Sequence, residues 1–313
     1  MLSSSAAAPC VPKPVAWLTA LRLPFTSVAV VPFVVGAWLA HAHGRLVSMA
    51  AALAGTVAVL LICVGCHLFG EAHDQAEDLL TLEHGRNKFS GGTLMVATGV
   101  LPALHVRLVA AAFFGVALLL GLYVCWVHSA LWLLGLGAFG GATAAVYTVP
   151  PVRLVKRGVG ELFIGLCYGW LTLVTGYASA SGTMPDFPHL AALPIALTVF
   201  NIIVINEFPD YEADRDTGKR NLMVRVGKRA GAIIYAIAMV STVASLVWLC
   251  ALRGPGSWVR IVAVLLPSCL GLWLAFQVAV RRAWTDRTRL EPAAGATIVL
   301  NLVCAVSVGV LLR

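Results

Sequence analysis

Long uninterrupted runs of apolar residues dominate this chain, and short polar segments separate them. A helix needs about 20 mostly apolar residues to cross the roughly 30 Å hydrocarbon core of a bilayer. The runs predict nine membrane-spanning helices, at residues 24–42, 48–69, 105–126, 129–149, 160–181, 189–208, 230–251, 258–280 and 292–312. We therefore expect an all-α, polytopic membrane protein, with a short disordered lead at residues 1–15 and a single transmembrane domain at 16–313.

The composition agrees with this pattern. Hydrophobic residues make up 60% of the chain, charged residues only 12%, and the mean hydropathy is +0.90. These values exclude a soluble domain with a few buried helices. The polar segments between the predicted helices must therefore hold most of the chemistry.

Basic residues are sorted by side of the membrane. Of the 22 Lys and Arg residues, all but Arg45, Arg253, Arg260 and Arg313 fall on the side of the N-terminus. The positive-inside rule predicts that this side of the cell membrane faces the cytoplasm. Nine helices then place the C-terminus outside. This sorting also explains the net charge of +8 without a nucleic-acid partner. Of the 14 acidic residues only Asp186 lies on the outer side, so we expect the active site to face the cytoplasm.

A nine-residue acidic pattern occurs twice, as GEAHDQAED at 70–78 and as NEFPDYEAD at 206–214. Laid over one another, the two copies share the pairs Glu71/Glu207, Asp74/Asp210 and Asp78/Asp214. A spacing of i, i+3 and i+7 puts three carboxylates on one face of a helix, and we expect the two faces to converge. Crowded carboxylates at low dielectric stay ionised if a divalent cation bridges them, which indicates Mg²⁺ and phosphate. The alternative for each copy alone is a solvated acidic helix end.

Basic residues follow each acidic copy and also fill the loop between them. Arg86 and Lys88 come after the first copy, and Lys219 and Arg220 after the second. A third loop carries Arg153 and Lys156, three residues apart, so both could point into the same polar mouth. Acid followed by base is typical of diphosphate binding, in which cations bind the oxygens that metal leaves uncovered. The alternative for the third loop is orientation of the chain and contact with lipid headgroups.

Three segments resemble the UbiA superfamily of intramembrane prenyltransferases, and more narrowly its branch related to menaquinone-pathway (MenA-like) enzymes. They are NEFPDYEADRDTGKRNLMVRVG at 206–227, YTVPPVRLVKRGVGELFIGLCYG at 147–169 and FSGGT at 89–93. The resemblance implies nine helices around a central cavity that opens at the cytoplasmic face, a lipid-side portal and Mg²⁺ dependence. The first motif departs from the family pattern at Gly70, where Asn is usual, and at Glu71, where Asp is usual.

The resemblance also implies a role for each matching residue. The metal and diphosphate ligands would be Glu71, Asp74, Asp78, Asn206, Asp210 and Asp214, of which the four aspartates are the expected catalytic carboxylates. The cations that would bind diphosphate oxygens by this resemblance are Arg153, Lys156, Lys219 and Arg220, to which the acid-then-base pattern adds Arg86 and Lys88.

These residues predict transfer of an isoprenyl group from an allylic diphosphate to an aromatic acceptor, such as a hydroxynaphthoate or hydroxybenzoate, in the bilayer. Neutralising the diphosphate ionises the allylic bond, and an electron-rich ring captures the cation. A terpene cyclase of the same superfamily uses a double bond of the same chain instead, and the altered first motif leaves that alternative open. A membrane transporter is a third alternative, but it should place ionisable groups near the bilayer midplane.

Overall fold

The protein is a bundle of long helices in the computed structural model, which describes residues 11–83, 91–254 and 256–313. No strand occurs within these ranges. The main helices are α1 (Lys13–Ala20), α2 (Leu23–Ala42), α3 (Met49–His73), α4 (Gln75–Glu83), α5 (Ala103–His128), α6 (Trp132–Thr148), α7 (Gly160–Gly165), α8 (Thr172–Ser181), α9 (Leu193–Asp216), α10 (Leu222–Arg253), α11 (Trp258–Ala275) and α12 (Arg287–Leu312).

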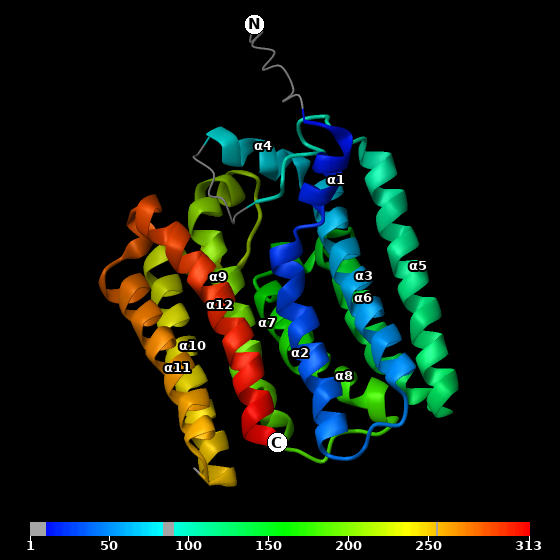
Figure 1. Ribbon diagram of the computed structural model, residues 1–313. Coiled ribbons are helices and arrows are strands. Elements are labelled where there is room, and N and C mark those ends of the chain that lie inside the picture. Colours follow the sequence, from blue (N-terminus) through cyan, green and yellow to red (C-terminus); the bar gives the residue numbers. More distant parts are fainter. Residues whose placement is uncertain (1–10, 84–90, 255) are drawn as a thin grey trace, which may run out of the picture.

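The all-α, multi-pass architecture predicted from hydropathy is confirmed. In the described ranges eight helical segments are long and apolar enough to cross a bilayer, and α6, with 17 residues, is a shorter apolar helix in the place of the fourth predicted span. One of the eight is the continuous segment Gly160–Ser181, in which a π-helical turn at Leu166–Leu171 joins α7 to α8. Helix α1 and the C-terminal end of α12 lie at opposite ends of the bundle, as an odd number of crossings requires (Figure 1).

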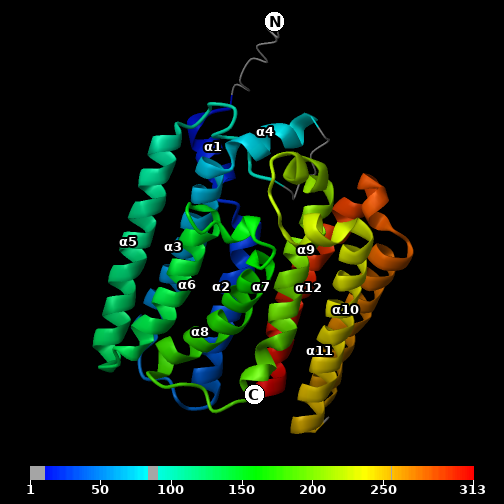
Figure 2. The same cartoon turned by 180° about the vertical axis from the view of Figure 1, so that it is seen from behind.

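The helices form a ring around a central space rather than a solid core. Helix α3 packs against α5 and α6, α2 packs against α8 and α12, and α9 packs against α10 and α12. Figures 1 and 2 show α5 and α11 at opposite edges of the bundle. Helix α9 contributes Ile195, Val199, Ile202 and Ile205 to the main hydrophobic cluster.

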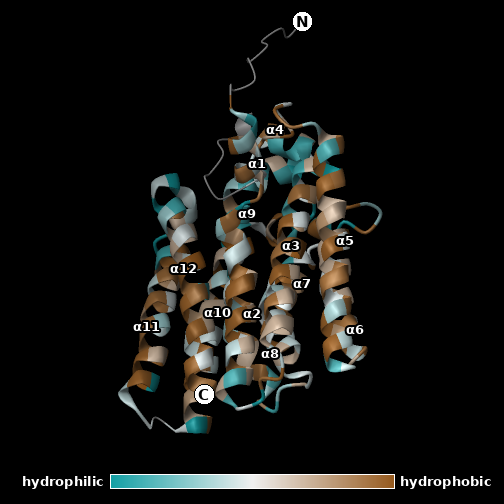
Figure 3. Cartoon of the chain, turned by 45° about the vertical axis from the view of Figure 1, so that its right-hand side comes forward, coloured by the Kyte–Doolittle hydropathy of each residue, from teal (hydrophilic) through white to brown (hydrophobic). Residues whose placement is uncertain are grey.

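Polar structure gathers at one end of this bundle. Helices α1 and α4 lie there, across the ends of the long helices, and hydrophilic residues concentrate around them (Figure 3). The same end holds the loop between α6 and α7, the turn between α9 and α10, and both acidic patterns. Helix α1 begins at Lys13, within the lead expected to be disordered, while residues 1–10 lie outside the described ranges.

The two acidic copies differ in backbone conformation. The second copy lies on one continuous helix, because α9 runs to Asp216, so Asp210 and Asp214 occupy neighbouring turns of one face, as expected. The first copy does not lie on one continuous helix. Helix α3 ends at His73, Asp74 is its C-cap, and Asp78 belongs to α4, which leaves the bundle axis (Figure 1). The expectation of a single helical face is therefore wrong for the first copy.

Candidate active site

The two acidic copies line one cavity of about 200 Å³ at the polar end of the bundle. Side chains from α2, α3, α4, α6, α9 and the turn at 91–92 form its wall. The charged and amide side chains in that wall are Arg22, Glu71, Asp74, Glu77, Asp78, Asn206, Glu207, Asp210, Asp214 and Lys219. Carboxylates more than 130 residues apart in sequence thus share one site, as the converging-faces prediction required.

The first acidic copy is neutralised by the loop between α6 and α7. Arg153 donates from Nη2 to Asp74 Oδ1 at 2.7 Å and lies 3.4 Å from Glu77 Oε1. Lys156 Nζ is 2.6 Å from the same Glu77 oxygen. Burial would raise the pKa of Glu77, but Lys156 and Arg153 outweigh it and lower that pKa. Arg153 and Lys156 therefore pair with acids of the first copy, but neither side chain lines the cavity itself.

For Asp78, burial outweighs the interactions that lower the pKa of the carboxyl. Its side chain is only 3% exposed, and burial raises its pKa to about 7, although a hydrogen bond from the Gly92 N–H lowers it. Glu71, 1% exposed, accepts a backbone hydrogen bond from Thr93. Without a further cation, the Asp78 carboxylate is costly to keep ionised.

The second acidic copy is held by the turn that follows it. Lys219 Nζ lies 3.0 Å from Asp214 Oδ1, and Asn221 donates its side-chain amide to Asp214 Oδ2 at 2.7 Å. Burial alone would lower the pKa of Lys219, but Asp214, Asp74 and Asp210 raise it well above its ordinary value. Lys219 is therefore a fixed positive charge between the two clusters.

Glu207 aligns with Glu71 in sequence, but its side chain has a different hydrogen-bond partner. Its Oε2 accepts a hydrogen bond from the backbone N–H of Met223 at 3.3 Å, and Glu161 Oε1 accepts one from Leu222 at 2.9 Å. Asn221 caps the same helix by accepting from Val224 N–H at 2.9 Å. Three side chains thus satisfy the first N–H groups of α10 and fix the turn that carries Lys219.

The donor set fits a hard divalent cation. Among the described residues no three His, Cys, Asp or Glu side chains already surround one point in ligand geometry, because cations and N–H groups of the chain hold the carboxylates. Buried oxygens in the cavity wall nevertheless lack a hydrogen-bond partner, among them Glu71 Oε2, Asp78 Oδ2 and Asn206 Oδ1. Carboxylate and amide oxygens are the ligands that Mg²⁺ accepts, and buried polar atoms rarely stay unpaired.

The predicted phosphate-binding cations differ in whether they line the charged cavity. Lys219 lines the cavity, while Arg153 and Lys156 lie beside it, behind Asp74 and Glu77. Arg220 is exposed and borders, with Arg215 and Arg225, a surface hollow that shares Lys219 with the charged cavity. Arg86 and Lys88 lie outside the described residues.

The sequence analysis did not predict two charged residues of the cavity wall as site residues. Glu77 was passed over because the second copy has Ala213 at the matching position. Arg22, just before α2, was treated only as part of the basic bias, yet it lines the cavity with its guanidinium 4.6 Å from the centre of the Phe25 ring. Its position ahead of the first span gave no pattern that distinguished it.

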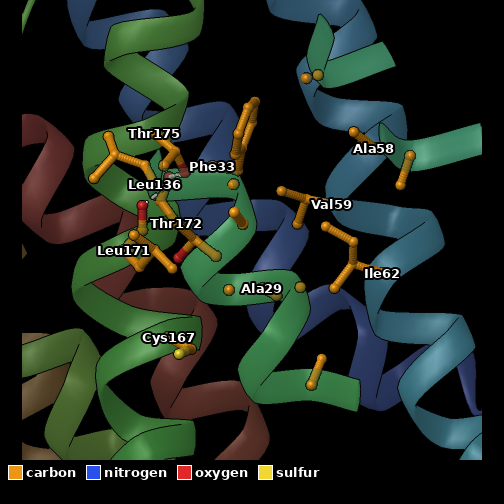
Figure 4. A pocket seen from close by; sticks show the side chains of 18 of the residues that line it. Ala29, Phe33, Ala58, Val59, Ile62, Leu136, Cys167, Leu171, Thr172 and Thr175 are labelled. Atoms are coloured by element: carbon orange, nitrogen blue, oxygen red, sulfur yellow. Dashed lines mark hydrogen bonds between the residues drawn. The ribbon is translucent and has the colours of Figure 1, made fainter. Parts of the chain in front are cut away.

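A second, apolar cavity of about 250 Å³ adjoins the first and shares Ile164 and Tyr168 with it. Figure 4 shows its wall, to which α2 contributes Phe33, α3 contributes Val59 and Ile62, and α8 contributes Thr172 and Thr175. Both threonine hydroxyls bond to carbonyls of their own helix, to Tyr168 at 2.6 Å and Leu171 at 2.7 Å. The cavity therefore offers a ligand an almost entirely apolar surface.

Comparisons with known proteins agree with this arrangement. The UbiA prenyltransferase family model matches residues 29–294. The 1,4-dihydroxy-2-naphthoate octaprenyltransferase of Bacillus subtilis (strain 168) is 30% identical over 229 residues, which cover 70% of this chain and 71% of the relative. The 2-carboxy-1,4-naphthoquinone phytyltransferase of a Synechocystis species is 25% identical over 235 residues, covering 72% and 70%.

The fold has solved counterparts. A UbiA homologue from Archaeoglobus fulgidus bound to DMAPP and Mg²⁺ superimposes with a TM-score of 0.63 at 16% identity, covering 93% of this chain and 99% of its own. The family match spans most of the chain and includes both acidic copies. The protein is therefore a member of the UbiA prenyltransferase family.

Proposed function

We propose that the protein transfers an isoprenyl group from an allylic diphosphate to an aromatic acceptor, with Mg²⁺ as its metal. The observation that carries this proposal is the convergence of two carboxylate clusters and Lys219 on one cavity that continues into an apolar cavity. A substrate with a charged headgroup and a long apolar tail would match the charged cavity and the apolar cavity. A transporter is disfavoured, because these carboxylates lie at one end of the bundle rather than at mid-membrane.

The charged half suits the ionisation of an allylic diphosphate. Mg²⁺, held by Glu71, Asp74, Asp78, Asn206, Asp210 and Asp214, would neutralise the diphosphate as a leaving group. Lys219 sits where it can stabilise the negative charge that develops on the departing oxygens, since it is already fixed between Asp214, Asp74 and Asp210. The adjoining apolar wall keeps water away from the allylic cation.

The acceptor side of the cavity is aromatic and basic. Phe25 and His67 meet edge to face with ring centroids 6.5 Å apart, and Arg22 lies over Phe25. An aromatic acid could place its ring among these groups and its carboxylate near Arg22. The two relatives named above carry naphthoate and naphthoquinone in their names, which supports a hydroxynaphthoate-like acceptor in quinone biosynthesis.

The apolar cavity would hold the isoprenyl tail. Along α3, lining residues run from Glu71 in the charged half to Gly55 in the apolar half, which is roughly 24 Å at ~1.5 Å per residue. An extended isoprene unit advances about 5 Å, given four carbon–carbon bonds of about 1.5 Å in a zigzag. We therefore propose that a chain of at least geranylgeranyl length fits.

The reaction should depend on the acceptor. Purified protein in detergent with Mg²⁺ and geranylgeranyl diphosphate is expected to form a prenylated product only when a dihydroxynaphthoate or hydroxybenzoate is added, because the electron-rich ring of the acceptor captures the allylic cation. Mass spectrometry of the organic extract measures this. A cyclic hydrocarbon or terpene alcohol made at catalytic rates without acceptor would instead establish a terpene cyclase on the same metal site.

Loss of one carboxylate from either cluster should disable turnover. Asp74→Ala and Asp210→Ala are each expected to lower kcat at least about a hundredfold, because each removes a ligand and leaves the other charges unbalanced. Glu212→Ala is the control, since Glu212 lies on the same helix but pairs with Arg215 and Lys228 outside the cavity. Near-normal turnover of either aspartate variant in saturating Mg²⁺ would contradict the proposal.

Filling the apolar cavity should shorten the accepted chain. A Cβ added at Gly137, which lines this cavity, meets no atom within 4 Å, so Gly137→Phe has room for its side chain at the cavity wall. We expect kcat/KM for geranylgeranyl diphosphate to fall about tenfold or more relative to dimethylallyl diphosphate. Gly115→Phe is the control, because Gly115 on α5 is equally unobstructed but outside the cavity. An unchanged ratio in the Gly137 variant would place the tail elsewhere.

We propose that the charged end faces the cytoplasm of the cell membrane, on the strength of the basic bias across the predicted spans. Single cysteines introduced at Thr217 and Met184 should then behave oppositely toward an impermeant thiol reagent added to intact cells of a background without other reactive cysteines. Only the cysteine at position 184 should react. Labelling at 217 alone would show the reverse orientation.

A further inference from the structure

The turn at residues 91–93 connects the two acidic clusters through its backbone. Gly91 N–H donates to Asp210 Oδ2 at 2.9 Å, and Gly92 N–H donates to Asp78 Oδ1 at 2.6 Å. Thr93 N–H donates to a carboxylate oxygen of Glu71. Three consecutive N–H groups thus contact three carboxylates, two from the first copy and one from the second. No side chain of the turn takes part in these contacts.

The sequence of the turn is what permits this close approach. Gly91 has φ of +66°, a left-handed conformation that side chains disfavour. A Cβ on Gly92 would lie 2.0 Å from Asp78 Oδ2 and 2.9 Å from Glu71 Oε1, so any side chain there would collide with the carboxylates. Glycine at 92 is therefore required for the backbone to reach both Asp78 and its neighbours.

The turn satisfies only part of each carboxylate. In Asp78 the Gly92 N–H engages Oδ1, while the buried Oδ2 has no hydrogen-bond partner. In Glu71 the Thr93 N–H engages Oε1, while the buried Oε2 has none. Both residues line the charged cavity. One oxygen of each is thus fixed by the chain and the other is left for a ligand from outside it.

We infer that the backbone of Gly91, Gly92 and Thr93 is a positioning element that orients Glu71, Asp78 and Asp210 for the divalent cation. This inference rests on the proposed function. Outer hydrogen bonds to metal-binding groups fix their orientation, and losing one typically weakens metal affinity about 10- to 100-fold. The opposite possibility is that the turn competes with the cation for the same carboxylates. The two possibilities predict opposite changes in metal affinity, since removing a competing turn would tighten metal binding.

The test measures metal affinity rather than turnover. The full chain in detergent is titrated with Mn²⁺ alone, free Mn²⁺ is followed by electron paramagnetic resonance, and Mg²⁺ is then added as competitor. Gly92→Ala, which forces the turn away from Asp78, should raise the apparent Kd about tenfold or more. Thr93→Pro, which deletes the N–H that reaches Glu71, should also raise it. Thr93→Ala keeps that N–H and should bind as the native chain does.

The comparison of these variants separates positioning from packing. Thermal unfolding without metal is measured for each, and a folded Thr93→Pro chain suffices if Gly92→Ala does not fold. Unchanged or tighter Mn²⁺ binding by a folded Gly92→Ala or Thr93→Pro chain overturns the inference, as does equal weakening by Thr93→Ala. If the native chain binds no divalent cation, the proposed function fails, and this inference fails with it.

Discussion

The structure depends on neutralising carboxylates that lie at the end of an apolar bundle. Asp74, Asp78, Asp210 and Asp214 share one cavity, and so much negative charge away from bulk water is unfavourable unless each group has a partner. Arg153, Lys219 and backbone N–H groups supply partners from three separate loops. The same requirement explains why the proposed metal fits there, because a divalent cation would add positive charge where the chain alone leaves oxygens unpaired.

This electrostatic requirement also organises the loops. The segment between α6 and α7 delivers Arg153 to Asp74, and the turn after α9 delivers Lys219 to Asp214. Glu161 and Glu207 hold the start of α10, so that turn is fixed at both ends. The bundle supplies an apolar cavity that adjoins the charged one. In the proposed function, headgroup and isoprenyl tail would therefore lie in separate cavities, with Tyr168 and Ile164 at their boundary.

Much of the fold was predictable because the bilayer restricts it. Hydrocarbon thickness sets the length of each apolar run, so the spans could be placed closely. The convergence of Asp74 and Asp210 was predictable because the two copies align without gaps. The break of α3 at Asp74 was not, since no Gly or Pro follows Gly70 within the first copy and the contact with Arg153 depends on a distant loop. Glu207 differed from Glu71 for the same reason: its partner is the start of α10.

The central claim is that both clusters form one metal-dependent diphosphate site. Its most direct test is calorimetric binding of a non-ionisable geranylgeranyl thiolodiphosphate to the purified chain, with Mg²⁺ and with chelator. Binding is expected to need Mg²⁺ in the native chain, and to be lost when either Asp78 or Asp214 is replaced by Asn. Equal affinity with and without Mg²⁺, or loss from only one of the two clusters, would contradict a shared site.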